Sequence, residues 1–154
     1  MRLTQRNDQP HVTKPLLMRL GAAFAVLYCA GAVLLVTFAF AGKTPYIIDG
    51  REVSREDWLQ LAVPLFGVTI VLMATIAYAL LRERPWSRPV VMLHWGAVGG
   101  YGLLLLALGT VERALAARVV AEAAAAGAFS AWYFYRKRNV VAYFKSLRSP
   151  ANYR

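Results

Sequence analysis

The sequence is poor in charged residues and in the residues from which catalytic and metal sites are usually built. Only 17% of its 154 residues are charged, whereas a typical soluble domain has about 25%. One cysteine, Cys29, and two histidines are present, so the chain can form no internal disulfide and has no Cys-x-x-Cys motif. The signatures of zinc hydrolases, serine hydrolases and phosphate-binding loops are also missing. We therefore expect neither an enzyme nor a metal site.

Apolar residues make up 58% of the chain and gather in four runs, at residues 20–41, 59–81, 89–109 and 114–135. Each run is close to the roughly 20 residues that a helix needs to cross a ~30 Å hydrocarbon core. None shows the alternation of apolar and polar residues that is typical of barrel strands. The sequence thus predicts an all-α, polytopic membrane protein, a four-helix transmembrane bundle that forms a single domain over residues 1–154.

The first run also resembles a secretory signal, because basic residues precede it and Ala39-Phe40-Ala41 ends it like a cleavage site. Its apolar stretch is longer than the 7–15 residues of a typical signal core. We expect it to be retained as a membrane-spanning helix.

The basic residues predict the orientation of the helices. If the N-terminus is cytoplasmic, 13 of the 18 lysines and arginines fall in cytoplasmic segments, as the positive-inside rule requires. The same bias accounts for the net charge of +10 without nucleic acid as a partner, since no recognition motif accompanies it. Both termini are expected to be cytoplasmic, where the basic surface would attract anionic lipids.

Two local sequences are similar to those of uncharacterised bacterial four-helix membrane proteins. They are the turn at residues 85–89 (Pro-Trp-Ser-Arg-Pro) and the ending at residues 132–137 (Trp-Tyr-Phe-Tyr-Arg-Lys). This resemblance implies a bacterial cytoplasmic membrane and no particular activity.

The connection at residues 44–53 contains an Asp-Gly turn between two short extended pieces and predicts a small hairpin as an external cap. Ser54 and Asp57 approximate a capping box, so the second helix should begin before Trp58. At the membrane interfaces we expect aromatic anchors, namely Trp58, Trp86, Trp132, Tyr133 and Tyr135.

The segment at residues 139–148 is amphipathic, with Val140, Val141, Tyr143, Phe144 and Leu147 on one helical face. It predicts a short cytoplasmic helix lying in the membrane surface, and the alternative is a helix that docks on a partner subunit. The candidate lipid- or partner-docking residues are Arg136, Lys137, Arg138, Phe144 and Lys145.

Small residues in the third run suggest a helix-packing face formed by Gly96, Gly99, Gly100 and Gly102. Gly96 and Gly100 have the G-x-x-x-G spacing that lets helix backbones approach closely in lipid. Packing within the bundle is the simplest interpretation. A seam for another protein's helix, a pigment or a lipid is the alternative.

Two ionisable residues lie at membrane depth. Glu122 is a functional candidate because a carboxylate inside a membrane helix is costly, although Arg118, one turn away, could form an intrahelical ion pair with it. For His94, the simpler interpretation is a histidine that is hydrogen-bonded near the inner interface. The alternative is that it alone ligates a haem or chlorophyll, since the only other histidine, His11, lies in the polar N-terminal segment and offers no second ligand.

These features predict a non-catalytic accessory or scaffold subunit of a larger membrane complex, for example a respiratory or photosynthetic one, with other membrane subunits as partners. A small transporter or ion-conducting homo-oligomer that uses Glu122 is the first alternative. A pigment or haem binder through His94 is the second; otherwise no cofactor is expected.

Overall fold

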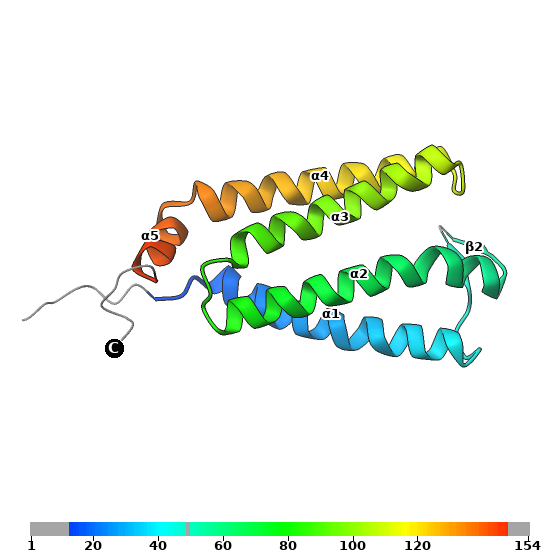
Figure 1. The fold of residues 1–154 in the computed structure, drawn as a ribbon, viewed down its shortest axis with the longest axis horizontal. Helices are drawn as coiled ribbons and strands as arrows, with labels where there is room; N and C mark the ends of the chain where they lie inside the picture. Colours follow the sequence, from blue (N-terminus) through cyan, green and yellow to red (C-terminus); the bar gives the residue numbers. More distant parts are fainter. Residues whose placement is uncertain (1–12, 49, 148–154) are drawn as a thin grey trace, which may run out of the picture.

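The computed structural model describes residues 13–48 and 50–147, and its described part is almost entirely helical (Figure 1). Four helices are long and apolar enough to cross a membrane, which makes the chain an integral membrane protein. They are α1 (Leu16–Phe40), α2 (Arg55–Leu81), α3 (Ser87–Leu108) and α4 (Arg113–Tyr135). A short fifth helix, α5 (Arg138–Ser146), follows them, and β1 (Ile47–Ile48) pairs antiparallel with β2 (Arg51–Glu52).

The helix ends follow local signals that extend beyond the apolar runs. α2 begins at Arg55 because the Ser54 hydroxyl accepts a hydrogen bond from the Asp57 backbone N–H at 3.0 Å, which satisfies one of the free donors of the first turn. α3 stops at Gly109, whose φ of 64° lies in the left-handed region that glycine tolerates. The expected hairpin around Gly50 forms as predicted, with Ile48 opposite Arg51.

The four long helices pack in chain order as two antiparallel pairs, α1 with α2 and α3 with α4, joined by contact between α2 and α3. Within the described residues, α1 and α4 have no comparable contact. Figure 1 shows the two pairs diverging from the end that carries α5 toward the end that carries the hairpin. We call these the α5 end and the hairpin end.

The main apolar core lies at the α5 end, where all five helices contribute to it. The large apolar residues elsewhere are mostly exposed, as expected of surfaces that face lipid rather than water. The buried core residues are Met18, Ala22, Ala25, Met73, Ile76, Ala77, Leu80, Val91, Tyr133, Phe134, Val140, Tyr143 and Phe144.

The apolar face of α5 is turned into this core and not toward the membrane surface. Val140, Tyr143 and Phe144 are at most 2% exposed. The Arg88 guanidinium of α3 lies 3.9 Å from the centre of the Phe144 ring, and Phe134 of α4 packs 6.1 Å from that ring. We expected α5 to lie in the membrane surface. It instead covers the end of the protein, because its aromatic face packs against residues of α3 and α4 there.

α3 and α4 pack closely at Gly99 and Gly102. A Cβ at Gly102 would lie 3.0 Å from a methyl carbon of Val120, and one at Gly99 would lie 3.4 Å from the Cβ of Ala123. Gly96 and Gly100 meet nothing within 4 Å. The G-x-x-x-G pair is therefore on the exposed side of α3, and the close approach uses the other two glycines.

Candidate functional site

Glu122 and Arg118 form an ion pair on the outside of α4. The Arg118 Nε donates to Glu122 Oε1 at 2.8 Å, and the side chains are 67% and 66% exposed. At 3.6 residues per turn, this pair lies opposite Ala116, Ala123 and Gly127, which occupy the α3 side of the helix. The pair is thus on the side of α4 that faces away from α3.

The pair lies well inside the helix. At 1.5 Å per residue, Glu122 is about 14 Å from Arg113 at one end of α4 and about 20 Å from Tyr135 at the other. Even a paired carboxylate and guanidinium retain hydrogen-bonding capacity that hydrocarbon cannot satisfy. Neither residue lines the two pockets described below, whereas transport through Glu122 would need a water-accessible cavity around it.

His94 is enclosed in the protein. It is 3% exposed, shares the inner face of α3 with Ser87 and Val91, and its ring lies edge-on to that of Trp95. Its Nδ1 has no hydrogen-bond partner among the described residues. It lies about 10 Å along α3 from Ser87, near the α5 end, so the structure does not bring it together with Glu122.

The described part of the chain contains no group of three histidine, cysteine or acidic side chains placed to hold a metal. His11, the other histidine considered for haem, lies outside the described residues. His94 is therefore the one histidine that the described residues offer as a haem or pigment ligand.

The five expected aromatic anchors divide into two groups. Trp86, Trp132 and Tyr135 are exposed, as interfacial anchors would be, whereas Trp58 and Tyr133 are only 6% and 5% exposed. Trp58 stacks 6.1 Å from Phe66 and lies 6.0 Å from Tyr46. It therefore holds the segment that leads into the hairpin against α2.

The candidate docking residues that follow α4 also fall into two groups. Arg136, Arg138 and Lys145 line a shallow pocket of about 350 Å³ at the α5 end, and three cations around one hollow suit an anionic lipid head group. Phe144 is instead in the core, and the Lys137 Nζ lies 5.2 Å from the centre of the Tyr133 ring. Burial, reinforced by the nearby Glu83 carboxylate, raises the pKa of Tyr143 above its usual value.

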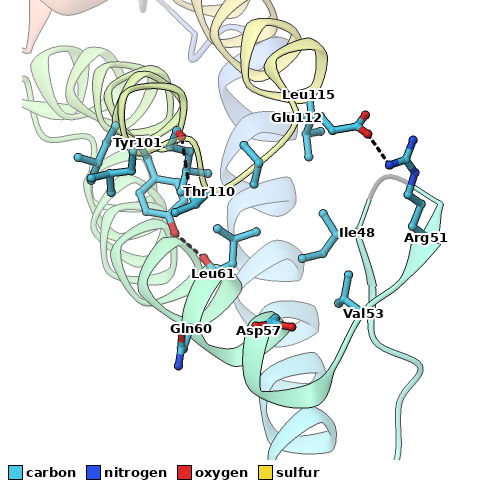
Figure 2. Close-up of a pocket in the computed structure, with 14 residues that line it drawn as sticks. Ile48, Arg51, Val53, Asp57, Gln60, Leu61, Tyr101, Thr110, Glu112 and Leu115 are labelled. Atoms are coloured by element: carbon cyan, nitrogen blue, oxygen red, sulfur yellow. Dashed lines mark hydrogen bonds and ion pairs between the residues drawn. The ribbon is translucent and has the colours of Figure 1, made fainter.

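A larger cavity, of about 560 Å³, opens at the hairpin end between α2, α3, the start of α4 and the hairpin (Figure 2). Its inner end is closed by the Tyr101 hydroxyl of α3, which donates to the Leu61 carbonyl of α2. At its mouth, Arg51 of β2 forms an ion pair with Glu112, the residue just before α4. The walls between these two contacts are mainly leucine and valine.

Sequence reasoning did not find this cavity, because its walls come from segments far apart in the chain. One local signal was available in Pro64, which has no N–H to donate to the Gln60 carbonyl and crowds the preceding turn of α2. That turn carries the Leu61 carbonyl to which Tyr101 donates. Pro64 therefore indicated where along α2 the cavity lies, but not which other segments form its walls.

Comparison with known proteins provides no identification. No protein-family model, curated protein or solved structure matches this chain.

Proposed function

We propose that this chain is a non-catalytic accessory subunit of a larger membrane assembly, and that the outer face of α4 docks against a membrane-spanning helix of another subunit. The observation that carries this proposal is the exposed Arg118–Glu122 pair at hydrocarbon depth. Charged groups in this position are costly when they face lipid and are usually found inside an assembly. A partner helix with hydrogen-bonding side chains would remove the pair from lipid.

The surroundings of the pair fit close helix packing. Ala114, Ala121 and Ala125 share the outer face of α4 with Arg118 and are exposed, so a second backbone can approach closely enough to cover both charges. Gly96 and Gly100 give α3 an exposed small-residue surface of its own. Two such surfaces suit a subunit that packs between neighbours.

The proposal includes an orientation. The α5 end would face the cytoplasm of a bacterial cell, because most basic residues lie there and the pocket lined by Arg136, Arg138 and Lys145 would then meet anionic lipids. The hairpin would lie outside.

Site-specific photo-crosslinking in native membranes tests the docking face. A photoreactive residue at Ala121 should form an adduct with one discrete protein, which mass spectrometry of the purified adduct would identify. Leu27 is the matched control because it is 70% exposed on α1, and the same residue there should react with lipid alone.

Two outcomes would overturn the proposal. Absence of any protein adduct at Ala121 would mean that the ion pair faces lipid. An adduct of this chain with itself alone would establish a homo-oligomer in place of an accessory subunit.

A further inference from the structure

The cavity at the hairpin end separates apolar from polar groups along its length. Asp57 and Glu112 lie at the beginnings of α2 and α4, and Leu61 and Leu115 line the cavity about one turn further along the same two helices (Figure 2). The two carboxylates are thus nearer the helix ends than these leucines by about 5 Å. This polarity matches that of a lipid in the surrounding bilayer.

The geometry points to a binding site for one membrane lipid with an ammonium-bearing, zwitterionic head group, such as an ethanolamine phospholipid. One acyl chain would occupy the leucine-lined part, and the head would lie at the mouth. The cavity volume of about 560 Å³ is within the range of roughly 300–1,000 Å³ that is typical of ligand sites. This inference is independent of the proposed docking of α4.

We place the entrance for an acyl chain beside Leu104 and Leu108 of α3. Both residues belong to the lining of the cavity and are 51% and 63% exposed, so the cavity is open where they lie. A chain that enters there from the bilayer would avoid contact with water, which costs about 25 cal/mol per Å² of apolar surface.

The hairpin covers the outer side of the cavity. Ile48 and Val53 line the cavity from the hairpin side (Figure 2), and the Arg51–Glu112 ion pair joins the hairpin to the start of α4. These contacts would keep water from the acyl chain while leaving the membrane side open.

The charges at the mouth select the head group. Two carboxylates, Asp57 and Glu112, line the cavity with one guanidinium, that of Arg51, which is already paired with Glu112. The Ser54 hydroxyl donates a hydrogen bond to the Asp57 carboxylate at 2.6 Å. Because this hydroxyl is neutral, it does not compensate the negative charge of Asp57. An ammonium head would be attracted to it, and an anionic head would be repelled.

Native mass spectrometry tests the site. The full-length protein would be released from nanodiscs that contain equal amounts of phosphatidylethanolamine and phosphatidylglycerol. We expect one tightly retained lipid per chain, with phosphatidylethanolamine preferred about fivefold, the size of one exposed charge contact. Leu105→Trp should fill the cavity and abolish this retention, whereas Leu103→Trp, two residues away and 54% exposed, should preserve it.

Two further variants complete the test. Val53→Trp fills the cavity from the hairpin, outside the helix contacts, and should also abolish retention if Leu105→Trp disturbs folding. Asp57→Asn should keep the lipid but lose the preference for phosphatidylethanolamine. Equal retention in Val53→Trp and Leu103→Trp, or equal retention of the two lipids by the unmodified protein, would overturn the inference.

Discussion

Gly102 leaves no room for a side chain between α3 and α4. Val119 and Val120 of α4 both reach the position that a side chain at Gly102 would occupy, at 3.1 and 3.0 Å from an ideal Cβ. The absence of a side chain at this residue therefore lets the two helices approach closely. Gly96, six residues earlier on α3, has open space instead.

Gly102→Leu should push α3 and α4 apart and lower the free energy of unfolding by about 1–3 kcal/mol, as is usual for overpacking. Denaturation in detergent micelles, followed by tryptophan fluorescence, would measure the change. Gly96→Leu is the matched control and should change the unfolding free energy by less than about 0.5 kcal/mol. Equal effects of the two substitutions would show that the α3–α4 contact does not depend on Gly102.

The sequence predicted contacts within one helix better than contacts between two helices. Glu122 and Arg118 were expected as an ion pair from their spacing alone, since residues four apart lie on one side of a helix, and the structure pairs them. The G-x-x-x-G spacing of Gly96 and Gly100 instead suggested the wrong side of α3 for the contact with α4. The rotation of a helix about its axis depends on its neighbours, which a spacing does not identify.

Among the helices, α5 shows that the apolar face of an amphipathic helix can pack either against lipid or against protein. The helical spacing of the apolar residues at 139–148 predicted a helix, and the structure has one at Arg138–Ser146. The pattern indicates only that one face avoids water. Whether that face meets lipid or protein depends on the Arg88 side chain and the aromatic residues at the end of α4, which lie elsewhere in the chain.

Phe144→Ala should release α5 from the core. Loss of a buried phenylalanine costs roughly 3 kcal/mol, so the amides of α5 should exchange with solvent roughly 100-fold faster. Hydrogen–deuterium exchange with mass spectrometry would measure this, with α1 to α4 unchanged. Lys145→Ala, an exposed neighbour, should have no such effect, and slow exchange of α5 in Phe144→Ala would mean that the helix is held by other contacts.

The four long helices were predictable because hydropathy over 20 residues is a strong signal. The early start of α2 at Arg55 was predicted as well, because the Ser54 cap is visible in the sequence. α1 begins four residues before its apolar run, directly after Pro15 and without a side-chain cap, and its apolar run did not indicate that start.

At the scale of the whole molecule, the two helix pairs are joined by packing at the α5 end and by the hairpin at the other. The Arg51–Glu112 ion pair is exposed, at 71% and 55% of the two side chains, so it contributes little to stability. It does connect the segment before α2 to the start of α4 across the cavity. We expect this ion pair to limit how far the two helix pairs separate at the hairpin end, while adding little to the free energy of unfolding.

Arg51→Gln should leave the unfolding free energy within about 1 kcal/mol of the original but broaden the distances between spin labels at Ile47 and Ala117. Pulsed electron paramagnetic resonance in nanodiscs would measure these distances. Arg118→Gln removes the other exposed ion pair, which lies within α4, and should leave them unchanged. An unaltered distribution in Arg51→Gln would mean that Ile48 and Val53 hold the hairpin by themselves.

The position of α5 in the core has a consequence for biosynthesis. Residues 138–146 are translated after all four membrane-spanning segments, yet they supply Val140, Tyr143 and Phe144 to the core at that end. A nascent or truncated chain that stops after Lys137 can insert its four helices but lacks the Phe144 ring that packs against Phe134 and Arg88. Exposed apolar surface is what chaperones and proteases act on, so we expect such a chain to be degraded faster than one in which α5 has docked.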